Sequence, residues 1–246
     1  MDPLSISAAS GLRSRMESLD MLANNLANAA TAGYKKDGES YGVYMSAAAL
    51  EGGADADPVT ATLPVIERRW TDYSSGVLQT TGSPLDLAIS GDGFFGVNGG
   101  GTTLYTRDGR FRVASNGLLE TLDGYPVRSA EGGEIRVQSS GPVQIAADGT
   151  VTQQGQALGR LDVVRFADRT NLMKAGASYY RTTDTPVAAT GIEILQGKLE
   201  GSNVNSAESS VRLVNVMRQF EVLTKAVMVN AEMNRKATEE VARVGS

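Results

Sequence analysis

The sequence predicts an α+β fold in which two terminal helices pair in a discontinuous, coiled-coil-like domain and bracket an antiparallel, hairpin-rich β domain. Two observations predict this fold. Apolar residues recur every three or four positions near each end of the 246-residue chain, which is the period of a helix buried along one side. Between the ends, short apolar runs alternate with Asp-Gly and Asn-Gly pairs, the strongest short hairpin signal.

The first helix is expected to begin at Asp2, a good N-cap, followed by Pro3 at the first helical position. Gly33 suits the left-handed residue that ends a helix, so the helical part is assigned to residues 1–33. Its apolar residues form a heptad seam: Ala9, Leu12, Met16, Leu19, Ala23, Leu26 and Ala30. An ordinary amphipathic helix on a globular core is the alternative interpretation.

Residues 34–75 carry weaker signals and are predicted to be a linker with an extended segment. The small, polar stretch Glu51–Asp57 is typical of a loop. The stretch Val59–Trp70 alternates in part between apolar and polar residues, as an extended strand does.

Residues 76–199 are predicted to form the β domain, because their apolar runs are short and follow a period of two. The runs are Leu85–Ile89, Phe94–Val97, Phe111–Val113, Ile135–Val137, Val143–Ile145 and Leu161–Phe166. The turns between them are expected to need a glycine that tolerates positive φ. These glycines are Gly93, Gly109, Gly117, Gly124 and Gly149.

The last helix is expected over residues 205–242, with Asn205 as its cap and Glu208 at the third position. Its seam consists of Leu213, Val216, Phe220, Leu223 and Val227. Neither terminal helix can bury a seam on itself, so residues 1–33 and 200–246 are predicted to pair as an assembly core. Both seams are wider than a helix pair requires, which indicates self-assembly or partner helices.

Composition excludes several classes of site. The chain has neither cysteine nor histidine, which removes Cys-His and Ser-His-Asp centres and most zinc or copper ligands. Its net charge of −5 disfavours general nucleic-acid binding. No stretch reaches the roughly 18 apolar residues of a membrane span, and the first residues lack the pattern of a cleaved signal peptide. No catalytic, metal or cofactor site and no small-molecule substrate is therefore predicted.

Two sequence features could indicate a cofactor site or a catalytic site. Gly91–Gly96 matches G-x-G-x-x-G, but the expected structure after it is a strand, whereas a dinucleotide site needs a helix there. Paired carboxylates of a polysaccharide-acting enzyme remain possible on residue types, with Asp86, Asp92, Asp108 and Asp123 as candidates. Three of these four precede glycine in turns, where the side chain has a structural use.

Side-chain amides gather near the end of the first helix, at Asn24, Asn25 and Asn28. Asparagine is a poor helix former. Beside an apolar seam, these amides suit hydrogen bonds between helices that fix register or partner. Ordinary solvent exposure is the alternative.

Several of these segments together resemble the flagellar basal-body rod family. Asn24–Lys35 is similar to the family's NNLAN-x-x-T-x-G-[FY]-K signature, and Gly82–Phe95 to its central segment. Tyr105–Phe111, Leu199–Val204 and Arg218–Glu221 match three further signatures in order. The compact length and the version of the Leu199–Val204 motif resemble proximal rod members more than distal rod or hook members.

The resemblance implies a structural subunit of the rod, with copies of itself and other flagellar axial proteins as partners. It also implies export by the flagellar type III apparatus without signal cleavage, and a location in the periplasm-spanning basal body. We hypothesise that interlocked helices transmit torque. The competing hypotheses are a carboxylate-dependent polysaccharide-acting enzyme and a β-rich binding module on a helical stalk.

Overall fold

The computed structural model describes residues 3–45, 62–138, 141–176 and 178–244. The chain divides into two compact units. Unit 1 combines Met1–Ala27, Asp37–Asp72 and Asn205–Ser246, and unit 2 combines Asn28–Lys36 with Tyr73–Val204. The predicted cap at Asp2 and the predicted loop at Glu51–Asp57 lie outside the described residues.

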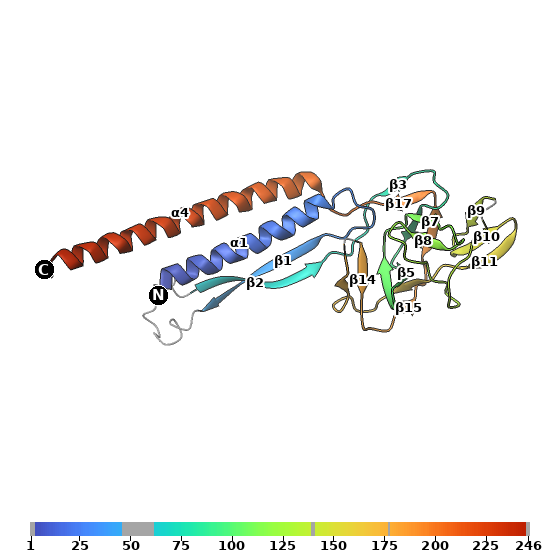
Figure 1. Ribbon diagram of the computed structural model, residues 1–246, viewed down its shortest axis with the longest axis horizontal. Helices are drawn as coiled ribbons and strands as arrows, with labels where there is room; N and C mark the ends of the chain where they lie inside the picture. The colour runs from blue at the N-terminus through green and yellow to red at the C-terminus, as the bar shows by residue number, and fades with distance from the viewer. Residues whose placement is uncertain (1–2, 46–61, 139–140, 177, 245–246) are drawn as a thin grey trace. The chain divides into compact units, whose positions relative to one another are not determined.

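Unit 1 consists of two helices and a hairpin. The elements are α1 (Pro3–Ala27), β1 (Asp37–Met45), β2 (Thr62–Thr71) and α4 (Ser206–Val244). Helix α1 packs against α4 and against both strands, and in Figure 1 it lies between α4 and the hairpin. The predicted pairing of the terminal helices is therefore present within one chain.

The strand expected within Val59–Trp70 is present from Thr62 onward as β2, whereas β1 and its pairing with β2 depart from the predicted linker. β1 and β2 pair antiparallel from Asp37 opposite Thr71 to Met45 opposite Thr62. One reason for this register lies at Gly38, because a Cβ there would approach within 2.6 Å of the Trp70 ring. The indole thus covers a glycine on the opposite strand, a cross-strand contact that stabilises a sheet.

The helix limits agree with the prediction at the start of α4 and differ most at the end of α1. α4 begins at Ser206, and the Asn205 side chain accepts hydrogen bonds from the backbone N–H groups of Ala207 and Glu208 at 3.1 and 3.2 Å, as an N-cap does. α1, in contrast, ends at Ala27, six residues before Gly33. Gly33 does have a positive φ of 67°, but it lies in a segment that belongs to unit 2.

Unit 2 is built from short strands, all paired antiparallel. Its largest sheet has the order β13-β14-β6-β5-β12-β15, a second has the order β11-β10-β9, and β16-β4, β17-β3 and β7-β8 form pairs. The strands are β3 (Leu78–Thr80), β4 (Leu87–Ser90), β5 (Phe94–Gly99), β6 (Thr102–Thr106), β7 (Phe111–Val113), β8 (Leu119–Thr121), β9 (Val143–Ile145), β10 (Thr150–Gln153), β11 (Gln156–Arg160), β12 (Val163–Arg165), β13 (Met173–Lys174), β14 (Tyr179–Arg181), β15 (Val187–Ala188), β16 (Glu193–Gln196) and β17 (Lys198–Glu200).

The apolar runs predicted as strands supply the core of unit 2. Side chains from these runs, including Leu87, Phe95, Phe111 and Leu161, form one buried cluster, which Leu119 and Val151 from outside the predicted runs complete. The run Ile135–Val137 contributes to the core but forms no strand, since only an isolated bridge joins Arg136 to Leu118. The prediction of an antiparallel, hairpin-rich β region is confirmed.

The turn glycines are correct in part. Gly117, Gly124 and Gly149 have positive φ, as expected, whereas Gly93 and Gly109 do not. These two are glycines for another reason. A Cβ on Gly109 would lie 1.7 Å from the Leu87 carbonyl oxygen, and one on Gly93 would lie 2.9 Å from a Val163 methyl group. Close approach of neighbouring chain, not the turn conformation, excludes a side chain at both positions.

Candidate functional site

The seam predicted on α4 faces the inside of unit 1. Val216 is buried at 6% exposure, and Leu213, Phe220, Leu223 and Val227 are half-buried. The spacing of three and four therefore identified the buried side of this helix. The same residues are the candidates for helix-to-helix packing.

The buried side of α1 differs from the predicted seam. Leu12, Leu19 and Leu26 are half-buried, but Ala9, Met16 and Ala23 are exposed, with Met16 at 55%. The most buried positions follow a neighbouring stripe of mostly small or polar residues: Gly11, Ser14, Ser18, Leu22 and Asn25. The physical reason is the hairpin, because α1 packs on both α4 and β1–β2 and the polar stripe meets the strands.

Asn25 joins α1 to the start of the hairpin. Its side-chain NH₂ donates to the Asp37 carbonyl at 2.8 Å, and its side-chain oxygen accepts from the Asp37 N–H at 2.9 Å. This reciprocal pair imitates a backbone strand partner. Asn25 was expected to bond between helices, and the structure places these bonds on β1 instead. Asn28 follows α1 and accepts a hydrogen bond from the Thr31 hydroxyl at 3.2 Å, while Asn24 is exposed on the helix.

A second set of polar contacts links α1, the hairpin and α4 within unit 1. The Tyr41 hydroxyl donates to Glu39 at 2.8 Å and is hydrogen bonded to Ser18 of α1. Arg212 of α4 lies 3.8 Å from the same Glu39 carboxylate, and Arg15 lies over the Tyr41 ring. Burial raises the pKa of Tyr41, and the Ser18 hydroxyl opposes that shift. These contacts position both helices on the hairpin.

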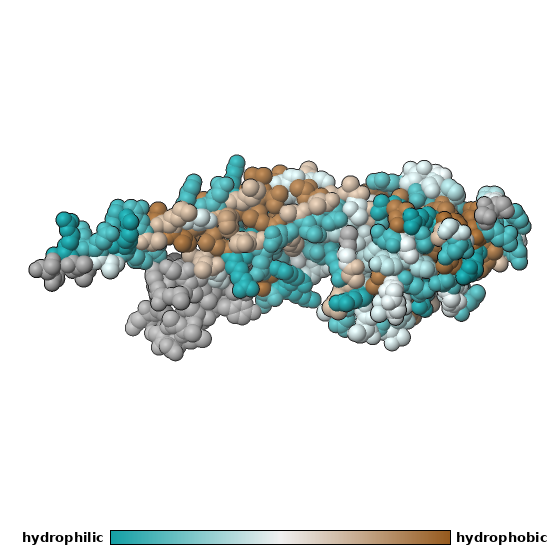
Figure 2. Space-filling model, in the orientation of Figure 1, coloured by the Kyte–Doolittle hydropathy of each residue, from teal (hydrophilic) through white to brown (hydrophobic). Residues whose placement is uncertain are grey.

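The opposite side of α4 exposes several apolar side chains, which alternate with charged ones such as Arg218 and Lys225. Val222 is 66% exposed and lies on the side of the helix away from Val216. The exposed apolar residues of α4 are Val211, Val214, Met217, Val222, Met228, Val229 and Met233. Figure 2 shows apolar residues along the middle of the helix pair and hydrophilic ones toward the C-terminal end of α4. Exposed apolar side chains that gather along one helix are a candidate surface for contact with another protein.

Unit 2 contains a buried charge cluster formed by Lys35, Arg107 and Glu200, whose side chains are at most 3% exposed. The Lys35 ammonium lies 2.5 Å from Glu200 Oε1, and the Arg107 guanidinium lies 3.0 Å from Glu200 Oε2. The Gly76 N–H also donates to Glu200 Oε1 at 2.8 Å. Buried charges are expected to be paired and hydrogen bonded in this way.

The cluster joins three segments that carry separate signatures in the sequence, Asn24–Lys35, Tyr105–Phe111 and Leu199–Val204. The Gly33 N–H donates to the Glu200 carbonyl at 2.8 Å, and the Lys36 N–H donates to Asn203 Oδ1 at 2.8 Å. Tyr34 is fully buried, with the Lys174 ammonium 4.3 Å from the centre of its ring. A Cβ on Gly33 would lie 2.3 Å from the Arg107 carbonyl carbon, which explains the glycine there.

Three of the four carboxylates considered as catalytic candidates contact a neighbouring side chain. Asp108 pairs with Arg110 at 2.6 Å, which raises the pKa of that guanidinium, and Asp123 accepts a 2.7 Å hydrogen bond from the Tyr179 hydroxyl. Asp92 pairs with Arg169, and the Asp86 backbone bridges to Arg110. Burial, more than the Asp123 contact, raises the pKa of Tyr179.

The motif Gly91–Gly96 leads from β4 into strand β5. The strand predicted to follow this motif is present, so its surroundings differ from those of a dinucleotide fingerprint, which opens a helix.

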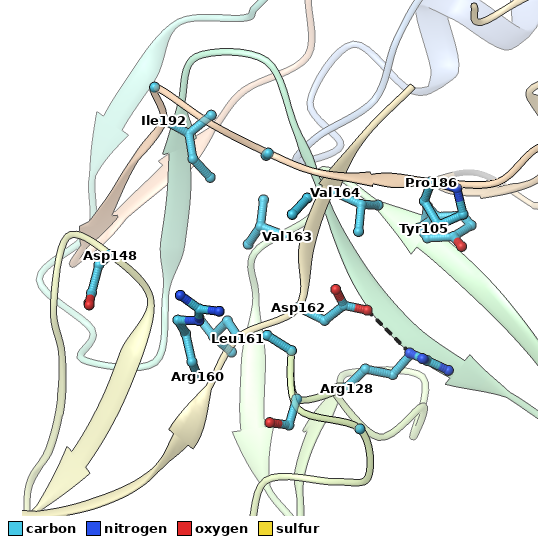
Figure 3. Close-up of a pocket in the computed structure, with 16 residues that line it drawn as sticks. Tyr105, Arg128, Asp148, Arg160, Leu161, Asp162, Val163, Val164, Pro186 and Ile192 are labelled. Carbon is cyan, nitrogen blue, oxygen red and sulfur yellow. Dashed lines mark hydrogen bonds and ion pairs between the residues drawn. The ribbon is translucent and has the colours of Figure 1, made fainter. Parts of the chain in front are cut away.

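A pocket of about 520 Å³ in unit 2 is lined by Arg128, Arg160 and Asp162 among others (Figure 3). Its central charges pair with each other, since Arg128 Nε donates to Asp162 at 3.2 Å and its terminal nitrogen donates to Thr103 at 3.0 Å. Burial raises the pKa of Asp162, and the Arg128 contact opposes this shift. The charged side chains that line this pocket are therefore paired with each other, and among its described residues no nucleophile is hydrogen bonded to a general base.

Sequence reasoning from residue types missed the buried charge cluster. Lys, Arg and Glu are almost always exposed, so spacing alone gives no reason to place three of them in a core. Within the described ranges, no group of three or more acidic residues is arranged to hold a metal ion. Neither described helix has a stretch apolar and long enough to cross a bilayer.

Comparison with protein families gives three matches along the chain. Residues 7–35 match the family described as flagella basal body rod protein, and residues 88–153 match the flagellar hook protein FlgE/F/G D1 domain. Residues 195–240 match the flagellar basal body rod FlgEFG protein C-terminal family. Each of the three matches contains one residue of the buried charge cluster, Lys35, Arg107 and Glu200 in turn.

Whole proteins of the same kind align along nearly the full chain. The flagellar basal-body rod protein FlgF of Caulobacter vibrioides is 36% identical over 231 residues, covering 92% of each chain. FlgF of Mesorhizobium japonicum is 33% identical, covering 82% of this chain and 83% of its own. The rod protein FlgG of Buchnera aphidicola subsp. Schizaphis graminum is 32% identical, covering 93% and 96%. This chain therefore belongs to the flagellar basal-body rod protein family.

Proposed function

We propose that this protein is a non-catalytic structural subunit of the flagellar basal-body rod, and that α4 builds the rod through its exposed apolar side. The observation that carries the proposal is the group of exposed apolar side chains on the outer side of α4, in addition to its buried seam. One side packs within unit 1, and the other exposes Val222 at 66%, Val229 at 58% and Met228 at 65%. Exposed apolar patches of this kind mark interaction sites.

The occupant of the outer side is proposed to be another helix of an axial protein, from a copy of this chain or a related subunit. Apolar side chains at helical spacing interdigitate with those of a facing helix, as knobs in holes. Sliding by one residue would unseat all knobs together. The packed helices would thus resist the shear that torque imposes, and transmit it along the rod.

The proposed location is the periplasm-spanning rod, reached through the flagellar type III export apparatus without a cleaved signal. Family membership supports this location. Two of the three relatives described above are FlgF proteins, and the FlgF relatives favour a proximal position in the rod. FlgG relatives of similar identity keep the distal position as the second candidate.

The test must separate assembly from folding. Leu19 and Phe220 are half-buried, so a charge at either would disturb both. Val222→Asp and Val229→Asp change exposed side chains, and Gln219→Asp places the same charge at an exposed polar position of α4. All three variants should keep the helical circular dichroism of the wild type.

In cells that produce only the variant, basal bodies are isolated and swimming is scored. Val222→Asp and Val229→Asp should be missing from the rod and abolish swimming, because a buried unpaired carboxylate is costly. Gln219→Asp should retain assembly. Normal incorporation and swimming of both valine variants would refute the proposed role of this side of α4.

A further inference from the structure

The buried charge cluster joins residues that are far apart along the chain. Lys35 and Glu200 are separated by 165 positions, and Arg107 and Glu200 by 93. Both cations contact the same carboxylate, one at each oxygen. Arg107 also lies 3.9 Å from Asp92, but the one carboxylate that both buried cations share comes from a late residue of the chain.

The strand pairs around the cluster have the same long-range character. β16 pairs with β4, bringing Glu193 opposite Ser90, and β17 pairs with β3, bringing Glu200 opposite Leu78. In contrast, β5–β6, β7–β8 and β10–β11 join strands that are neighbours in sequence. Pairing of strands that are neighbours in sequence closes a short loop at a small cost in conformational entropy. Pairing of distant strands closes a long loop, and this larger entropy cost precedes the gain from the contacts.

We propose that Glu200 completes unit 2 as its last step, so that residues 28–36, β3 and β4 remain open until β16 and β17 dock. Before docking, Lys35 and Arg107 lack the carboxylate that both contact in the folded unit, and their burial is opposed by desolvation. A chain made from its N-terminus carries both cations well before Glu200. The local hairpins form without it, and the segment that follows α1 is fixed only when residue 200 arrives.

Native-state hydrogen exchange on the full-length chain tests this order, because amides of a segment that opens first exchange faster than those of a persistent core. The variant is Glu200→Gln, which keeps the shape and the carbonyl acceptor but removes the charge. The matched control is Glu193→Gln, the same change at an exposed position of neighbouring β16. The reporters of the docked segment are the amides of Gly33, Ile194 and Gly201, which donate to Glu200, Ala147 and Val77. The reporters of the local hairpins are the amides of Leu119, Thr121 and Val127, which donate to Ile135, Tyr125 and Leu119.

In Glu200→Gln, the docked-segment amides should exchange at least about a hundredfold faster, and the hairpin amides should change less than about threefold. Glu193→Gln should leave all six amides near the wild-type rates. Equal acceleration of all six amides in Glu200→Gln would show that unit 2 opens as one piece and would overturn the proposal. Unchanged rates would overturn it as well.

A second variant covers the case in which Glu200→Gln does not fold. Lys35→Met removes one cation and retains the contact between Arg107 and Glu200. The same selective acceleration is expected, to a smaller extent, because one charge contact of the cluster remains. Uniform acceleration, or none, in Lys35→Met would contradict the late closure.

Discussion

Replacing Asn25 by alanine removes both hydrogen bonds that tie α1 to Asp37 at the start of the hairpin. Each such bond contributes about 1 kcal/mol net, and the half-buried Asp37 amide and carbonyl would lose their partner. Alanine is a better helix former and returns about 0.6 kcal/mol. The free energy of unfolding of unit 1 should therefore fall by about 2 kcal/mol.

Denaturant unfolding can be followed by two probes that report on unit 1. Trp70 is the sole tryptophan of the chain and lies in β2, and both described helices belong to unit 1, so fluorescence and helical circular dichroism follow the same unit. Asp20→Ala, at an exposed position of α1, controls for helix propensity. A loss below about 0.5 kcal/mol in Asn25→Ala, or one matched by Asp20→Ala, would refute the role assigned to the Asn25 amide.

Two further predictions concern unit 2. Gly109→Ala should destabilise the protein more than Gly124→Ala, although only Gly124 has positive φ. A Cβ at position 109 would lie 1.7 Å from the Leu87 carbonyl oxygen, whereas a Cβ at position 124 would have no atom within 4 Å. In thermal unfolding we expect losses of about 3 kcal/mol or more and about 1–2 kcal/mol, respectively, and equal losses would contradict the close-approach argument. The Thr150 N–H and hydroxyl lower the pKa of Asp148 below its ordinary value of 3.8, so the stability from this turn is present above pH 3.8 and is lost as the pH falls through the lower folded-state pKa. Thr150→Val should raise the Asp148 pKa in a carboxyl NMR titration, and an unchanged value would show that the hydroxyl contributes nothing.

The elements that follow from local sequence were predicted well. The seam Leu213–Val227 identified the buried side of α4, and Asn205 identified its first turn, because helical spacing and capping act over a few residues. The positive φ of Gly117, Gly124 and Gly149 likewise follows from the turn itself. The antiparallel pairing of the β region could be inferred from these turns.

Features that depend on contacts between residues far apart in the sequence were not predicted. β1 contains two glycines and few β-branched residues, so its strand character comes from pairing with β2 and packing on α1. Because α1 also packs on the hairpin, its buried residues include Ser14 and Ser18, whereas Met16 of the predicted seam is exposed. The buried position of Glu200 depends on cations 93 and 165 residues earlier, a relation that no local pattern contains.

The two helices of unit 1 differ in length, with 25 residues in α1 and 39 in α4. At 1.5 Å per residue they span about 38 and 58 Å. If copies stack through these helices as proposed, they would not all end at one level, and the boundary between one copy and the next would be staggered. A fracture across such a filament would have to pull helices apart lengthwise instead of separating flat ends, so the stagger would add resistance to bending.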